Sequence, residues 1–298
     1  MLAIAGPTAS GKSALALRVA EALDAEIVNA DALQVYDRLH ILTARPSEEE
    51  TARIPHHLYG YVQPDTAYST GQWTRDALAA ITDIQSRGKR ALLVGGTGLY
   101  FRSLFHGIAP IPDPGEAARE TARDLAPEAL LAEARRLDPV ATALLQSPDP
   151  QRLQRIVSVA LGTDKPLSEW WAGTEPLVPD FAAAVVELPR AELYSRIDSR
   201  FDHMLDNGAM EEAQALSHLP SDLPALKAIG VRHLLASARG ELDIAEAVEL
   251  SKRDSRRLAK RQMTWFRNQH PLWPRIAPGA DAGAFLHTAL PPTVSPST

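Results

Sequence analysis

The sequence predicts an α/β protein in which a parallel β-sheet is flanked by helices and interrupted by an all-helical insertion domain. Two observations support this fold class. Through roughly the first hundred residues, short apolar runs alternate with stretches of helical periodicity, which is the pattern of strand–helix–strand units. From about residue 109 the pattern is helical only, until an apolar run returns at residue 185.

The N-terminal part of the chain contains three expected strands, each a short apolar run. In chain order we expect a strand at 2–5, a glycine-bearing turn at 6–13, a helix at 14–23, a strand at 26–30, a helix at 73–87 that Gly88 ends, and a strand at 91–94. Because helices connect these strands, they are predicted to be parallel, with helices on both faces of the sheet.

The predicted insertion begins after residue 108, where Pro110, Pro112 and Pro114 break any regular element. A strand at 185–188 is expected to rejoin the sheet. Further helices are expected at 190–207, 209–218, 224–236 and 243–269. These expectations divide the chain into a core of residues 1–108 and 185–277, a helical insertion of residues 109–184, and a loosely ordered tail of residues 278–298, rich in Pro, Gly, Ala and Ser.

Composition excludes several classes of protein. The 298 residues include no cysteine, which excludes disulfides, thiolate zinc sites and a cysteine nucleophile. No run approaches the roughly 18 apolar residues that cross a bilayer, and the N-terminus lacks the apolar region of a signal peptide. We therefore expect a cytoplasmic protein. Its net charge is −6, yet seven cations and a single acid lie between Lys252 and Arg267.

One motif in the sequence carries specific chemistry. Gly6, Pro7, Thr8, Ala9, Ser10, Gly11, Lys12 and Ser13 match G-x-x-x-x-G-K-S/T in full. The match lies between an expected strand and an expected helix, so it predicts a P-loop NTPase-like core that binds a diphosphate or a triphosphate. Lys12 is expected to reach the outer phosphate, and the Ser13 hydroxyl to hold Mg²⁺.

Asp31 follows the second expected strand, at the sheet edge where the phosphate loop also lies. Three interpretations of it stay open on position alone: a general base, a Mg²⁺ ligand, or a helix or turn cap. Thr97 follows the third strand, and its hydroxyl either faces the same site or caps a helix.

Several sequence blocks, in order, resemble the tRNA dimethylallyltransferase family, also called tRNA isopentenyltransferases or IPP transferases. They are GPTASGKS at 6–13, NADALQVY at 29–36, TARP at 43–46, PHHL at 55–58, LVGGTGLY at 93–100, QRLQR at 151–155, AIG at 228–230 and KRQMTW at 260–265. The resemblance implies transfer of a dimethylallyl group from its diphosphate to the exocyclic amine of adenosine 37, next to the tRNA anticodon. It also implies that the phosphate loop holds the donor diphosphate and that the insertion covers the tRNA.

The same resemblance implies roles for individual residues. Asp31 becomes the general base, Thr97 a contact to the substrate adenosine, and Arg232 a contact to the donor diphosphate beside Lys12. Contacts to tRNA are implied for Asp31, Ala32, Leu33, Gln34, Thr97, Arg119, Gln151, Arg152, Arg155, Lys260, Arg261 and Arg267. Without the resemblance, Arg119, Arg152 and Arg155 would be interpreted as solvated surface charges. The cationic stretch 252–267 favours phosphate contact, since its like charges would otherwise repel one another.

The chain departs from the family pattern at three positions: Ala32 replaces a serine, Leu42 a glycine and Val231 a tyrosine. The first puts a hydroxyl contact to the base in doubt. The absence of a cysteine-based zinc finger indicates the short bacterial type, which we expect to be a monomer. His56 and His57 are expected to pack and hydrogen-bond, and Trp265 and Phe266 to lie in the core.

Other functions remain as alternatives. The same chemistry could act on free adenine nucleotides, although a small acceptor requires neither a helical insertion nor a cationic helix. A small-molecule P-loop kinase would bind and turn over ATP. A non-catalytic RNA-binding protein is disfavoured by Asp31 beside an intact phosphate loop.

Overall fold

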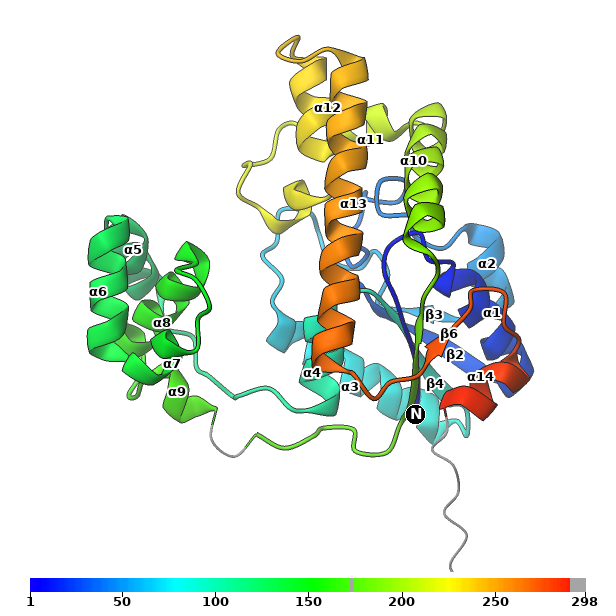
Figure 1. The fold of residues 1–298 in the computed structure, drawn as a ribbon, viewed down its shortest axis with the longest axis horizontal. Coiled ribbons are helices and arrows are strands. Elements are labelled where there is room, and N and C mark those ends of the chain that lie inside the picture. Colours follow the sequence, from blue (N-terminus) through cyan, green and yellow to red (C-terminus); the bar gives the residue numbers. More distant parts are fainter. Residues whose placement is uncertain (172–173, 290–298) are drawn as a thin grey trace, which may run out of the picture. The chain divides into compact units, whose positions relative to one another are not determined.

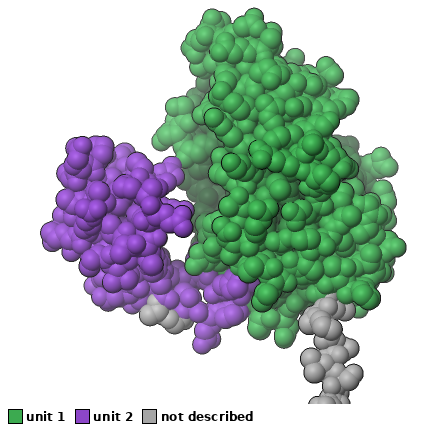
Figure 2. Space-filling view, viewed as in Figure 1, with its two compact units in different colours: residues 1–103, 178–298 green, residues 104–177 purple. Residues whose placement is uncertain are grey.

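The computed structural model describes residues 1–171 and 174–289 and divides the chain into two compact units (Figures 1 and 2). The first unit contains residues 1–103 and the chain from Val178 onward, and the second contains Leu104–Leu177. The first unit is an α/β domain, and the second is wholly helical.

All strands of the first unit form one six-stranded sheet in the order β3-β2-β4-β1-β5-β6, and every pairing is parallel. The strands are β1 (Leu2–Ala5), β2 (Ala25–Ala30), β3 (His56–His57), β4 (Arg90–Gly95), β5 (Ala182–Val186) and β6 (Arg275–Ile276). The expected parallel α/β sheet is therefore confirmed. Because β2, β4 and β1 are neighbours, the loops that follow them meet at one edge.

The helices of the first unit cover both faces of this sheet. They are α1 (Lys12–Leu23), α2 (Glu48–Arg53), α3 (Thr70–Ser86), α4 (Gly98–Phe105), α10 (Arg190–Asp206), α11 (Ala209–Ala215), the 3₁₀ helix Pro224–Lys227, α12 (Val231–Ala238), α13 (Ile244–Gln269) and α14 (Ala282–Ala289). Alternate strand residues such as Ile4 and Ile27 pack with α1 and α14 on one face. The intervening residues face the opposite side, where Trp73 of α3 donates its indole N–H to the Asn29 carbonyl.

Two expectations at the end of the core differ from the structure. Strand β5 begins at Ala182, so residues 182–184 belong to the sheet and not to the insertion. Three consecutive alanines do not look like a strand, but here they are buried beside β1. In the expected loose tail, α14 packs Phe285 fully into the core beside α1, while residues 290–298 lie outside the described part.

The second unit contains α5 (Glu116–Asp124), α6 (Pro127–Leu137), α7 (Pro139–Ala143), α8 (Pro150–Gly162) and α9 (Leu167–Trp170). It has its own apolar core, in which Leu130 of α6 packs with Leu153 and Ile156 of α8. Asp138 and Asp149 cap α7 and α8 through their side chains. Among the described residues of the whole chain, none of the helices is long and apolar enough to cross a membrane.

Candidate active site

The phosphate loop joins β1 to α1 in the conformation its motif predicts. Ala9 and Gly11 adopt positive φ angles of 61° and 86°, so the loop turns tightly around one centre. Gly6 must be glycine, because a Cβ atom there would lie 2.9 Å from Ser10 Oγ and 3.1 Å from the Val186 carbonyl. Gly11 occupies the N-cap of α1 and has no side chain, so the first N–H groups of that helix remain available to an anion.

Two cations lie at this loop. Lys12 Nζ donates to the Pro7 carbonyl at 3.3 Å, and Arg200 of α10 donates to Thr8 Oγ1. Burial lowers the pKa of Lys12 to about 8; the Asp31 carboxylate opposes this shift and Arg200 adds to it. Burial likewise lowers the pKa of Arg200, again opposed by Asp31. The structure thus brings Lys12, Arg200 and Asp31 into one electrostatic cluster.

Asp31 stands directly after β2 and is fixed by its neighbours. The buried Asn29 accepts from the Asp31 N–H and donates to the Asp31 carbonyl, while Asp31 Oδ1 accepts from the Leu33 N–H at 3.0 Å. Thr97 Oγ1 accepts from the Ala32 N–H at 2.9 Å. Asp31 and Thr97 therefore lie at the sheet edge as predicted, and the Thr97 hydroxyl positions the chain next to Asp31.

A cavity opens beside these groups. Its polar lining includes Thr8, Asp31, Thr43, Arg200 and Ser255. The rest of its wall is apolar and consists of Leu33, Leu42, Ile197, Phe201, Met204, Ile229 and Leu258. A few polar groups set in an apolar wall are typical of a small-molecule site. The cavity can therefore hold an apolar group next to a bound phosphate and a carboxylate.

Sequence reasoning missed Arg200 and the apolar wall around it. The signal was present, because Leu193, Ile197, Phe201 and Met204 form the buried stripe of α10 and Arg200 lies within it. A cation inside an apolar stripe needs an anionic partner. Sequence reasoning also missed Gln262 of α13, which accepts from the Thr8 N–H.

The cationic helix α13 differs from its prediction in one respect. Its charges are partly neutralised within the chain, since Lys252 pairs with Asp202 and Arg256 pairs with Asp198, both on α10. These two helices lie side by side in Figure 1. Repulsion among these like charges is therefore partly relieved within the chain, contrary to the expectation. The exposed cations of the helix are Arg253, Arg257, Lys260, Arg261 and Arg267.

The insertion residues form a group of their own. Arg119 of α5 pairs with Asp113 and Glu116, and Arg155 of α8 lies near enough to Arg119 for the two charges to interact. Burial is the largest cause that lowers the pKa of Arg155, and Arg119 adds to it. Gln151 and Arg152 are exposed at the start of α8. Of these residues, Arg119 and Arg155 lie close together on the second unit.

The position of Arg232 differs from the one expected for a residue that contacts the donor diphosphate. Its side chain projects from α12, is 68% exposed, and pairs with Asp254 of α13. A role at the donor diphosphate stays a prediction for this residue. The Gln34 side chain donates to the Thr43 and Ala44 carbonyls and so ties the segment after β2 to residues 43–44.

The remaining expectations concern packing. His57 Nε2 bonds to Glu26 and His56 Nδ1 to the Ile54 carbonyl, and the described residues contain no cluster of three metal-ligating side chains. Phe266 is buried against Phe101, as expected of a core residue. Leu42, one of the unusual residues, lies in the cavity wall.

A parallel sheet with a phosphate loop, a carboxylate and an apolar cavity at one edge defines a P-loop protein. Comparison with known proteins is more specific. The family model for IPP transferases matches residues 34–269, and that for isopentenyl transferases matches residues 1–59. A protein of Maricaulis maris named tRNA dimethylallyltransferase is 52% identical over 283 residues, which is 92% of each chain.

Solved structures agree. A tRNA isopentenylpyrophosphate transferase from Staphylococcus epidermidis is 31% identical with a TM-score of 0.69, covering 96% of this chain and 95% of that one. A eukaryotic dimethylallyltransferase acting on tRNA shares the fold with a TM-score of 0.81 at 24% identity, covering 97% of this chain and 76% of its own. The chain belongs to the IPP transferase family.

Proposed function

We propose that this protein transfers the dimethylallyl group of dimethylallyl diphosphate to the exocyclic amine of adenosine 37 in tRNA, releasing diphosphate. The observation that carries the proposal is a cavity with a mostly apolar wall, which Thr8 of the phosphate loop, Asp31 and Arg200 line together. Family membership supports it. We expect the protein to act as a cytoplasmic monomer.

The donor would lie with its diphosphate on the loop and its prenyl chain in the cavity. Lys12, Arg200 and the N-terminal N–H groups of α1 would stabilise the negative charge that develops as the allylic C–O bond breaks. The apolar wall would shield the allylic carbon from water. The carbon–nitrogen bond then forms from the adenine amine, and Asp31 takes the proton that the amine loses.

The Ser13 hydroxyl is the group of this site that would hold Mg²⁺. Ser13 presents an exposed hydroxyl directly after Lys12, and Mg²⁺ commonly combines one or two protein oxygens with phosphate oxygens and water. Ser13 would therefore hold the ion together with the donor diphosphate. The ion supplies charge neutralisation of the leaving group.

One experiment tests the proposed donor and the proposed acceptor together. Purified protein is incubated with dimethylallyl diphosphate, Mg²⁺ and unmodified tRNA, and the tRNA nucleosides are analysed by mass spectrometry. We expect adenosine carrying one dimethylallyl group, and an unmodified tRNA would contradict the proposal. AMP prenylated as efficiently as tRNA would point to the nucleotide-modifying alternative, and ATP turnover to a kinase.

A further inference from the structure

Gln262 connects the phosphate loop to the loop that follows β4. Its Oε1 accepts from the Thr8 N–H at 2.8 Å, and its Nε2 donates to the Gly96 carbonyl at 3.1 Å. The orientation of the amide is unambiguous, because an N–H needs an oxygen and a carbonyl needs a donor. Gln262 therefore presents a carbonyl oxygen, and not an NH₂ group, to the phosphate loop.

The position of this side chain is tightly constrained. A Cβ atom on Gly96 would lie 2.3 Å from Gln262 Nε2, so only glycine fits there. One turn further along α13, Trp265 packs on Gly98, where a Cβ atom would lie 1.9 Å from the indole nitrogen. Gln262 is 8% exposed. Burial and its two hydrogen bonds therefore hold this side chain against Thr8.

Thr8 lies at the outer end of the phosphate loop. In a P-loop the lysine reaches the outermost phosphates, while the N-terminus of the helix holds the inner ones. Here Lys12 Nζ lies on the Pro7 carbonyl, next to Thr8. The Thr8 N–H is taken by Gln262 and its hydroxyl by Arg200. The backbone donor at Thr8 is thus already occupied by a protein group.

We propose that Gln262 is a specificity-determining positioning residue that limits the phosphate loop to two phosphates and so rejects triphosphates such as ATP. A third phosphate beside Thr8 would find the Thr8 N–H already bonded to Gln262, and the partial negative charge of the Gln262 carbonyl oxygen would repel it. This inference rests on the proposed function, because it explains how a P-loop can hold a prenyl diphosphate in a cell rich in ATP.

The test measures binding of inorganic diphosphate and inorganic triphosphate, each with Mg²⁺, by calorimetry. Wild type should prefer diphosphate. Gln262→Ala frees the Thr8 N–H, and a hydrogen bond to a charged group corresponds to roughly tenfold or more in affinity. The preference for diphosphate should therefore fall by about tenfold in this variant. Gln262→Glu is the matched control: it keeps an acceptor at Thr8 and adds negative charge, so the preference should stay or rise.

Several outcomes would overturn the inference. It fails if wild type binds both anions equally, a result that needs no variant. It also fails if Gln262→Ala, shown by its melting curve to be folded, keeps the wild-type preference, or if Gln262→Glu relaxes it. If wild-type protein prenylates tRNA but any of these binding results is obtained, only the inference about Gln262 is contradicted. Protein that does not prenylate tRNA would contradict the proposed function.

Discussion

At the scale of single residues, Asp31 is the group whose chemistry is most specific. Asp31→Asn keeps an oxygen that can accept from the Leu33 N–H but cannot take a proton. We expect kcat to fall by about 10²–10⁴-fold, with tRNA and donor affinities little changed. Steady-state and binding measurements on both substrates check this. The exposed Asp65→Asn variant should behave as wild type, and near-normal turnover in Asp31→Asn would remove the base assignment.

Lys12 predicts a pH dependence for donor binding. Its pKa in the free protein is lowered to about 8, so the ammonium is present below pH 8 and is lost as the pH rises through that value. The dissociation constant for dimethylallyl diphosphate should therefore increase above pH 8, by up to about tenfold per pH unit. Binding titrations from pH 6 to 9.5 measure it.

The matched variant is Lys12→Arg, because a guanidinium stays charged throughout this range. Its donor affinity should be lower than that of wild type but flat between pH 6 and 9.5. An equally steep pH dependence in Lys12→Arg would show that another group titrates.

Some site residues could be predicted from sequence, and others could not. The phosphate loop is a contiguous motif, and Asp31 and Thr97 each follow an apolar strand, so local patterns suffice. Arg200 and Gln262 reach Thr8 from positions 192 and 254 residues away. Only the packing of α10 and α13 brings them there, and no local pattern encodes that packing.

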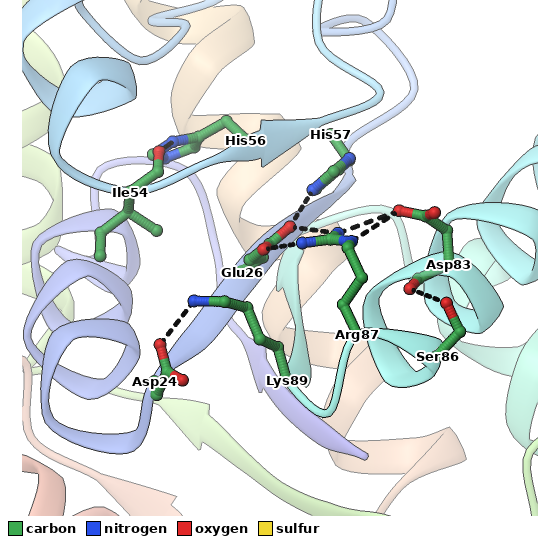
Figure 3. Close-up of polar contacts among 9 residues, drawn as sticks. All are labelled: Asp24, Glu26, Ile54, His56, His57, Asp83, Ser86, Arg87 and Lys89. Atoms are coloured by element: carbon green, nitrogen blue, oxygen red, sulfur yellow. Dashed lines mark hydrogen bonds and ion pairs between the residues drawn. The ribbon is translucent and has the colours of Figure 1, made fainter.

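At the scale of elements, a buried carboxylate links β2, β3 and α3 (Figure 3). Glu26 is the second residue of β2, is 2% exposed, and accepts two hydrogen bonds from Arg87 and one from His57. Arg87 also pairs with Asp83. Because these donors outweigh the effect of burial, the pKa of Glu26 is lowered from 4.5 to about 2.

This cluster predicts acid sensitivity. A carboxyl whose pKa is depressed by folding contributes stability that is present above its unfolded pKa and is lost as the pH falls through the folded value. The contribution of Glu26 should therefore decline between about pH 4.5 and pH 2. Glu26→Gln should lower the free energy of unfolding at pH 7 by about 2–3 kcal/mol, less than for a fully buried pair because Arg87 is 41% exposed. Urea denaturation at several pH values measures both effects.

The exposed pair of Arg53 and Glu21 supplies the control. Surface pairs contribute about 0–1 kcal/mol, so Glu21→Gln should change stability little and leave its acid dependence unaltered. If Glu26→Gln cost no more than Glu21→Gln, the cluster would not stabilise the sheet.

At the scale of the whole molecule, alternating strand and helix patterns were enough to predict a parallel α/β core with a helical insertion. Strands β3 and β6 have two residues each, too few to leave a periodic signal. The strand order also could not be predicted, because pairing of β1 with β4 and β5 depends on contacts distant in sequence.

The overall charge of −6 makes the placement of cations important for an RNA substrate. Lys260 and Arg261 are adjacent and exposed on α13, on a helix whose buried face carries Gln262. Lys89 and Arg90 are also adjacent, but Arg90 is the first residue of β4, so they lie at the opposite edge of the sheet from the candidate site, where Lys89 pairs with Asp24. The two pairs carry equal charge and differ in position, which makes them a matched comparison.

Reversing both charges at Lys260 and Arg261 to glutamate should weaken tRNA binding and leave donor binding unchanged. If each cation neutralises one RNA phosphate, the slope of log affinity against log salt should also become shallower by about 1.4 to 1.8. The same reversal at Lys89 and Arg90 should change neither the affinity nor the slope, because a general effect of net charge would act on both variants alike. Fluorescence titration of tRNA across a salt series distinguishes these cases. Equal losses in the two double variants would mean that α13 attracts RNA only through overall charge, and an unchanged slope in the Lys260/Arg261 variant would mean that its cations are solvated.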